Sequence, residues 1–227
     1  MLKHLFSILF PDNCPGCDAP FITGEKIICN LCKIKLPRTG FHNLPENAVA
    51  KSFWGKIHLH SATALFHFDK GEVVQKLLHQ LKYKDNKEVG LLLGSLLANE
   101  IKDAGGYSDV DCIIPVPLHK KKLSVRGYNQ SELIAEGMAA TWQVQVSTDL
   151  LIRKKNTDSQ TRKSRFMRFE NVDKVFALDN EDVYRDKHIL IVDDVITTGA
   201  TIVACAEAFD HIPGCKISVA SIAFAHS

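Results

Sequence analysis

The residues best suited to chemistry lie near the C-terminus, in residues 189–201. Four apolar residues lead into the adjacent acids Asp193 and Asp194, and a turn rich in threonine and glycine follows. The turn consists of Thr197, Thr198, Gly199, Ala200 and Thr201. Hydroxyl groups and the free N–H groups at a helix N-terminus bind phosphate, and glycine lets the backbone approach closely. Adjacent carboxylates suit sugar hydroxyls, Mg²⁺ or both, so we expect a sugar-phosphate site. The stretch has neither the Walker A lysine nor the three glycines of a dinucleotide fingerprint.

Four of the seven cysteines form two Cys-x-x-Cys pairs, Cys14 with Cys17 and Cys29 with Cys32. Each turn directs two thiolates to one point, so two turns close a tetrahedral shell of four sulfur atoms, which suits Zn²⁺. Free or redox-active thiols and an iron–sulfur cluster are the alternatives. We expect a structural zinc ribbon whose metal supplies much of its folding free energy. The spacing leaves open whether the ribbon stabilises the chain, docks partners or contacts nucleic acid.

Two further segments are basic. Residues 119–126 hold three lysines and Arg126 but no acid. A guanidinium matches phosphate geometry, so we expect Arg126 and Asn129 to contact a ligand, whereas the three lysines fit a solvated loop equally well. Residues 153–168 hold seven basic residues and one acid. That charge suits a DNA backbone. Phe166 and Phe169 could stack on bases, although anchoring the segment to the core is the stronger explanation for them.

The order of expected elements indicates how these residues are positioned. Apolar runs predict strands at residues 61–68, 110–116, 189–192 and 217–224, with short strands near 151–152 and 175–178. Helical spacing predicts helices at residues 74–81, 88–101, 129–142 and 200–209. Residues 153–170 are expected to form a long loop. Strands that alternate with helices imply a mostly parallel α/β sheet, and such sheets bind ligands at the carboxyl ends of their strands.

Composition restricts the class of protein. The chain has 227 residues, of which 45% are apolar and 24% charged, the usual mixture of a globular protein. A net charge of +2 excludes a polycation that coats nucleic acid. Residues 1–10 are too short an apolar run for a secretory signal, and we expect a short helix that packs on the protein or on a partner. We expect neither a transmembrane run nor an export signal, so the predicted compartment is the cytoplasm. Disulfides are rare in that compartment, so the seven cysteines do not indicate a disulfide framework.

The stretch 189–201 is similar to the binding signature for 5-phosphoribosyl 1-diphosphate (PRPP) in type I phosphoribosyltransferases. Pro-Val-Pro-Leu-His at 115–119, followed by Arg-Gly-Tyr-Asn-Gln at 126–130, resembles the ComF family of competence proteins and their amidophosphoribosyltransferase-like relatives. The four-cysteine ribbon has the same place in that family. The resemblance covers nearly the whole chain, with small departures: Tyr128 stands where phenylalanine is common, and residues 160–171 match loosely.

This resemblance implies a fold, two domains and a set of ligand contacts. The expected fold is a type I phosphoribosyltransferase-like α/β domain at residues 46–227, with a zinc ribbon at 1–45. Asp193 and Asp194 would bind ribose hydroxyls, and the turn at 197–201 would hold the 5-phosphate, with Mg²⁺ accompanying PRPP. The expected pyrophosphate loop comprises Val116, Pro117, Leu118, Arg126 and Asn129. The expected mobile loop over PRPP contributes Arg162, Arg165 and Arg168.

The resemblance favours a PRPP-binding protein that acts in DNA uptake during natural transformation, with single-stranded DNA and DNA-uptake proteins as partners. Two alternatives are an active phosphoribosyltransferase on an unidentified acceptor and a non-catalytic regulator that responds to PRPP. No motif names an acceptor or a general base. Leu2 stands where a glutaminase domain would begin with a catalytic cysteine. Catalytic residues and oligomeric state are therefore left unassigned.

Overall fold

A computed structural model describes residues 12–69, 72–148, 150–152, 175–178 and 180–225. The helix expected at residues 1–10 lies outside the described residues. So does the basic segment 153–174, which includes Arg162, Arg165 and Arg168. Within the described ranges, no helix combines the length and the hydropathy needed to cross a bilayer.

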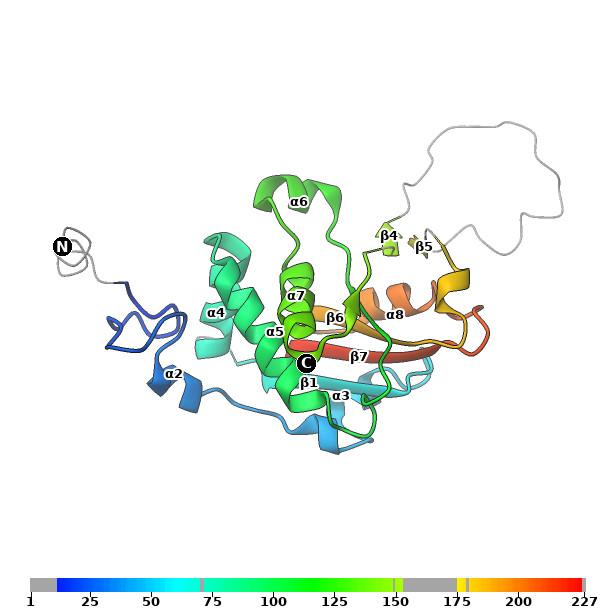
Figure 1. Cartoon of the computed structure of the whole chain (residues 1–227), viewed down its shortest axis with the longest axis horizontal. Helices are drawn as coiled ribbons and strands as arrows, with labels where there is room; N and C mark the ends of the chain where they lie inside the picture. Colours follow the sequence, from blue (N-terminus) through cyan, green and yellow to red (C-terminus); the bar gives the residue numbers. More distant parts are fainter. Residues whose placement is uncertain (1–11, 70–71, 149, 153–174, 179, 226–227) are drawn as a thin grey trace.

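The centre of the fold is a five-stranded sheet with the order β1-β7-β6-β2-β3, in which every neighbouring pair is parallel (Figure 1). Its strands are β1 (Ser61–His67), β2 (Cys112–Pro115), β3 (Gln145–Val146), β6 (His188–Ile196) and β7 (Lys216–Phe224). Two short antiparallel strands, β4 (Leu150–Ile152) and β5 (Phe176–Leu178), form a separate pair. The predicted mostly parallel α/β sheet is confirmed.

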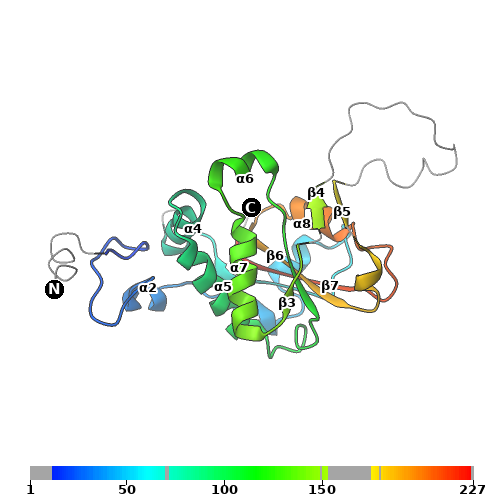
Figure 2. The ribbon, with the colours of Figure 1, turned by 45° about the horizontal axis from the view of Figure 1, so that its top comes forward.

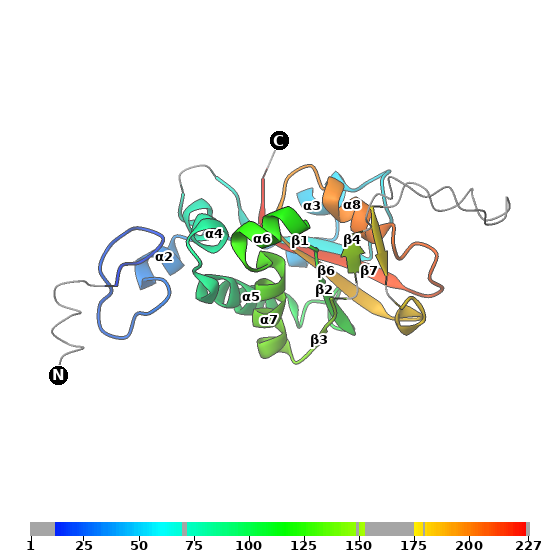
Figure 3. The same ribbon diagram turned by 90° about the horizontal axis from the view of Figure 1, so that it is seen from above.

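Helices cover both faces of this sheet (Figure 3). One face carries α4 (Val73–Tyr83), α5 (Lys87–Ile101) and α7 (Gln130–Trp142), and the other carries α3 (Ala48–Ser52) and α8 (Ala200–Ala206). The remaining helical segments are α2 (Asn30–Ile34), η1 (Phe41–Asn43), α6 (Lys120–Arg126) and η2 (Asp182–Tyr184). Along β6 the side chains alternate between the two layers: Leu190 and Val192 join the first core, and Ile189 and Ile191 join the second. A strand buried on both faces explains the continuous apolar run in the sequence.

Two glycines let α5 and α7 approach each other closely. A Cβ atom at Gly94 would lie 2.0 Å from the carbonyl oxygen of Ile134, and one at Gly137 would lie 2.2 Å from that of Leu91. No side chain fits at these distances, so the backbones themselves are in contact. This packing fixes α7, whose N-terminal end faces the carboxyl ends of β2 and β6.

The strand connections create a crevice at those carboxyl ends. The chain leaves β2 through α6 and α7 to β3 on one side, and leaves β6 through α8 to β7 on the other. Because β2 and β6 are neighbours and their connections run in opposite directions, the loops separate between them. This is the topological switch point at which open α/β sheets bind ligands.

Three expected elements differ from the structure. Strand β6 was expected to end at Val192 but continues to Ile196, so Asp193 and Asp194 lie within the strand, because pairing with β7 extends past them. Residues 120–126 were expected to form a loop but form α6. The His119 side chain accepts a hydrogen bond from the N–H of Lys121 at the start of this helix, and Gly127, with φ of 82°, ends it. Helix α8 is shorter than expected, and the chain continues in turns from residue 207.

Candidate phosphate cleft and metal centre

The acids at the end of β6 are held by hydrogen bonds from three elements. Asp193 Oδ1 accepts bonds from the Ser131 hydroxyl of α7, at 3.0 Å, and from the backbone N–H of Asp194, at 2.8 Å. The Asp194 carboxylate pairs with the Lys82 ammonium of α4, with both oxygens about 3 Å from Nζ (2.9 and 3.0 Å). The two side chains are partly buried, so they have fixed positions yet can be reached by a ligand.

The electrostatics of this pair favour a ligand that brings hydrogen-bond donors or a cation. Burial and the neighbouring charge of Asp194 raise the pKa of Asp193 to about 7, and the bonds from Asp194 N–H and Ser131 only partly offset them. Two adjacent carboxylates thus carry more negative charge than their surroundings compensate. Ribose hydroxyls and Mg²⁺ both provide the missing compensation, and the donor set suits Mg²⁺ because it consists of oxygen atoms.

The turn after β6 presents its polar groups to solvent. Gly199 adopts φ of +74°, and a Cβ atom there would lie 2.6 Å from the Phe53 ring, so this position requires glycine. Thr197, Thr198 and Thr201 are exposed. The N–H of Ala200 donates to the Thr198 hydroxyl over 3.4 Å. The exposed hydroxyls can therefore take part in binding an anion.

A cleft of about 430 Å³ joins the acids to the segment that follows β2. It is lined by Asp193, Asp194 and Thr201, and by all five residues expected in the pyrophosphate loop, Val116, Pro117, Leu118, Arg126 and Asn129. The structure therefore brings together two motifs that are more than 60 residues apart in the sequence. Thr197, Thr198, Gly199 and Ala200 follow the strand beside the cleft and are not part of its lining.

Asn129 is a buried structural contact within this cleft. Its Nδ2 donates to the carbonyl oxygen of Val116 at 2.9 Å and to Glu132 at 3.2 Å, while its Oδ1 accepts from the N–H of Ser131 and caps α7. Asn129 thus joins the end of β2 to the start of α7. Its polar atoms are already engaged, so the structure gives it a role in shaping the loop, whereas its expected contact with a ligand stays a prediction.

Arg126 reaches the cleft from the end of α6. Its guanidinium lies over the ring of Tyr83, 5.5 Å from the centroid, and Lys122 lines the same cleft. The Tyr128 hydroxyl donates to the carbonyl oxygen of Leu81, which connects the α6–α7 junction to α4. Sequence reasoning missed Lys82 and Ser131. Lys82 has the pattern of an ordinary lysine on the polar face of an amphipathic helix, and Ser131 that of an ordinary first-turn serine.

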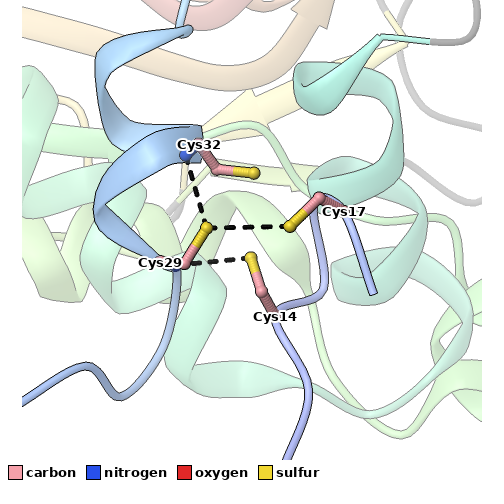
Figure 4. Close-up of side chains that lie close together, drawn as sticks. All are labelled: Cys14, Cys17, Cys29 and Cys32. Carbon is pink, nitrogen blue, oxygen red and sulfur yellow. Dashed lines mark hydrogen bonds between the residues drawn. The ribbon is translucent and has the colours of Figure 1, made fainter. Parts of the chain in front are cut away.

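The four N-terminal cysteines converge as their spacing predicts (Figure 4). All four sulfur atoms lie within 4.8 Å of one another, and the Cys17 and Cys29 sulfurs are 3.7 Å apart. Sulfur atoms at tetrahedral positions around zinc, each about 2.3 Å from the metal, are about 3.8 Å apart. Backbone N–H groups of Gly16 and Cys29 point at the Cys14 sulfur (3.4 and 3.3 Å), and that of Cys32 points at the Cys29 sulfur (3.4 Å).

Thiol acidity in this cluster fits a metal centre. Burial raises the pKa of the Cys14 thiol, but hydrogen bonds from the N–H groups of Cys29, Gly16 and Cys17 outweigh it and lower the pKa to about 7. Burial and the neighbouring sulfurs raise the pKa of Cys32. Four crowded thiols cannot all ionise without a cation among them, whereas a bound Zn²⁺ would stabilise all four thiolates.

A second cluster, at the amino ends of strands β6 and β7, has a structural role. The His188 ring forms hydrogen bonds through both nitrogens: Nδ1 lies 2.7 Å from an Asp109 carboxylate oxygen, and Nε2 lies 2.8 Å from the Ser218 hydroxyl. The His60 ring packs edge-on against the His188 ring. The order serine–histidine–aspartate resembles a hydrolase triad. Ser218, however, is fully buried, so no substrate can reach its hydroxyl. Lys216 also pairs with Asp109 at 3.0 Å, which disfavours a cation there.

Comparison with known proteins shows similarity to the phosphoribosyl transferase domain over residues that include the acids of this cleft. The family model for the phosphoribosyl transferase domain matches residues 129–227. DNA utilization protein YhgH of Shigella flexneri is 32% identical over 142 residues, 61% of this chain and 62% of that protein. Competence protein F of Haemophilus influenzae is 31% identical over 137 residues, 58% of this chain and 59% of that protein. The chain thus spans about three fifths of the length of the curated relatives it matches.

A solved structure of glutamine PRPP amidotransferase from B. subtilis, complexed with ADP and GMP, also matches. Its identity is 17%, its TM-score 0.43, and the match covers 64% of this chain and 30% of that one. The domain match and the sequence relatives confirm the resemblance to the ComF family and the phosphoribosyltransferase-like fold.

Proposed function

Because the chain is a ComF-like protein with a phosphoribosyltransferase domain, we propose that the cleft between β2 and β6 binds PRPP together with Mg²⁺. The observation that carries this proposal is the convergence of two separate motifs on one cleft. Asp193 and Asp194 end one strand, and the segment 116–118 follows its neighbour. A ligand with a phosphate at one end, hydroxyls in the middle and a diphosphate at the other end uses both motifs at once.

The proposal gives each group of residues a role in binding. The acids Asp193 and Asp194 accept hydrogen bonds from the ribose hydroxyls. The turn residues Thr197, Thr198, Gly199, Ala200 and Thr201 hold the 5-phosphate. Residues 116–118 and the Arg126 guanidinium bind the diphosphate, and Asn129 keeps that loop in place. Arg162, Arg165 and Arg168, which lie outside the described residues, are assigned to the loop over the ligand by the family resemblance alone. Bound Mg²⁺ neutralises diphosphate charge, and Zn²⁺ holds Cys14, Cys17, Cys29 and Cys32 together.

Calorimetric titration of the zinc-loaded protein with PRPP and Mg²⁺ tests this proposal. We expect binding by the wild type and none by the variant Asp193→Asn/Asp194→Asn. The control is Asp182→Asn, which removes an exposed acid that pairs with Arg185 on the same surface turn. Absence of wild-type binding, or binding that survives the double substitution, would contradict the proposal.

We further propose that the protein acts in the cytoplasm on single-stranded DNA during DNA uptake. The names of its relatives, which refer to DNA utilization and competence, support this role, as does the basic composition of residues 153–168. Oligonucleotide binding should weaken as salt rises and should weaken further in the variant Arg162→Ala/Lys163→Ala/Arg165→Ala. Oligonucleotide binding that changes neither with salt concentration nor with the triple substitution would contradict the DNA role.

Turnover separates the two alternatives. An active phosphoribosyltransferase would release pyrophosphate from PRPP when supplied with its acceptor, whereas a regulator would bind PRPP and leave it intact. The groups that line the cleft support binding of PRPP, whereas the acceptor and the general base are left unassigned. A pyrophosphate-release assay over a panel of bases and amines distinguishes the two.

A further inference from the structure

Helix α4 contributes a side chain to the cleft although it precedes the region that the phosphoribosyl transferase family model matches. Lys82, in the last turn of α4, places its ammonium 2.9 and 3.0 Å from the two oxygens of Asp194. The Lys82 side chain is 25% exposed and that of Asp194 is 14% exposed, so this ion pair is shielded from bulk solvent. It belongs to the same cleft as Arg126 and Lys122.

The packing of α4 fixes the position of the backbone from which the Lys82 side chain extends toward Asp194. Leu81, the preceding residue, is fully buried, and its carbonyl oxygen accepts the bond from the Tyr128 hydroxyl. The backbone next to Lys82 is therefore fixed, while the lysine side chain is a flexible stem with a point charge at its end. Such a side chain can move its charge by several ångströms without any movement of the helix.

The charges around Lys82 indicate its role: the ammonium lies beside two adjacent carboxylates. Asp193 and Asp194 place two carboxylates in adjacent positions near the end of β6, and the Lys82 ammonium pairs with the second of them. Lys82 supplies the nearest positive charge among the described residues. A ligand whose hydroxyls and Mg²⁺ bind the two acids removes the reason for that ion pair. The ammonium, still in a partly buried cleft, then requires another anion.

We propose that Lys82 is a specificity-determining residue that exchanges its pairing with Asp194 for a pairing with the diphosphate when PRPP binds. This inference rests on the proposed binding of PRPP. The wall formed by Lys82, Lys122 and Arg126 lies beside residues 116–118, where the diphosphate is expected. A ligand with ribose and 5-phosphate but no diphosphate offers Lys82 no new partner. The lysine then keeps competing for Asp194, and that ligand binds weakly.

The test compares two ligands on two variants. PRPP and ribose 5-phosphate, each with Mg²⁺, are titrated into wild type, Lys82→Met and Lys82→Arg. Methionine keeps an unbranched side chain of similar length without the charge. We expect Lys82→Met to weaken PRPP binding at least tenfold and to leave ribose 5-phosphate binding unchanged or tighter. Lys82→Arg should keep PRPP affinity within about threefold of wild type, because it retains a cation.

A matched control and the opposing outcomes complete the design. Lys76→Met removes an exposed lysine from the same helix and should change neither affinity. Circular dichroism and thermal melting establish that each variant folds. Equal weakening of both ligands, or no effect on PRPP, would overturn the role of Lys82 while PRPP binding by wild type stands. If wild type binds neither ligand, the proposed function fails, and the inference fails with it.

Discussion

The proposed binding of a sugar phosphate at Asp193 predicts an affinity that depends on pH in the neutral range. Burial and the charge of Asp194 raise the pKa of Asp193 to about 7, and ribose hydroxyls or Mg²⁺ would bind the ionised carboxylate. With that pKa, about nine tenths of the protein is ionised at this position at pH 8 and about one tenth at pH 6. We therefore expect the affinity for PRPP with Mg²⁺ to fall about tenfold from pH 8 to pH 6, or ~1.4 kcal/mol.

Calorimetry at several pH values measures this profile, with Ser131→Ala as the decisive comparison. Phosphate groups of the ligand also titrate near pH 6, so the wild-type profile alone does not identify the group. The bond from the Ser131 hydroxyl favours the ionised form of Asp193. Its removal should raise the pKa of Asp193 and move the midpoint of the profile to higher pH, while the ligand's titration stays the same. A flat wild-type profile, or equal midpoints in both proteins, would refute the assignment to Asp193.

Three further predictions concern the metal, the helix packing and the loop. Purified protein should contain one zinc per chain, and a chelator or Cys14→Ser should release it and lower the melting temperature; a metal-free protein with unchanged melting would contradict the structural role of the metal. Gly94→Ala should destabilise the protein by roughly 1–3 kcal/mol in denaturant titration, because its Cβ would lie 2.0 Å from the Ile134 carbonyl oxygen. Gly105→Ala, which meets open space, is the control, and equal stability of the two variants would be inconsistent with the packing. Asn129→Ala should cost about 1–3 kcal/mol of unfolding free energy through the lost cap and the unpaired buried carbonyl, and should weaken PRPP binding in calorimetry; unchanged stability would argue against its role as the cap.

Local sequence pattern was sufficient where a residue's role depends on its neighbours in the chain. Asp193 and Asp194 come directly after the buried apolar residues of β6, and Gly199 begins the helix that follows, so strand, acids and turn are ordered by the chain itself. The same holds for the cysteines, because each Cys-x-x-Cys turn places two sulfurs within one tight bend. The extent of β6 was underestimated, because its pairing with β7 continues past the apolar run, and that of α8 was overestimated.

Contacts that depend on the tertiary arrangement could not be predicted in this way. Ser131 is 62 positions from Asp193, and Lys82 is 112 positions from Asp194. Neither the polar face of α4 nor the first turn of α7 carries a pattern that distinguishes these two residues from solvated ones. Helix α6 was missed for a related reason: three consecutive lysines indicate a solvated segment, and the caps at His119 and Gly127 are visible only in the structure.

The four-cysteine segment and α4 pack together across the domain boundary expected after residue 45. Cys14, Ile28 and Cys32 belong to the same buried cluster as the apolar face of α4, and in Figure 2 the ribbon lies beside that helix. A Cβ atom at Gly16, within the first Cys-x-x-Cys turn, would lie 3.0 Å from Val73 at the start of α4. The other end of α4 carries Lys82 into the cleft. The four-cysteine segment therefore packs against the start of the helix whose last turn meets the acids, and the proposed zinc would support the helix that carries Lys82 into the cleft.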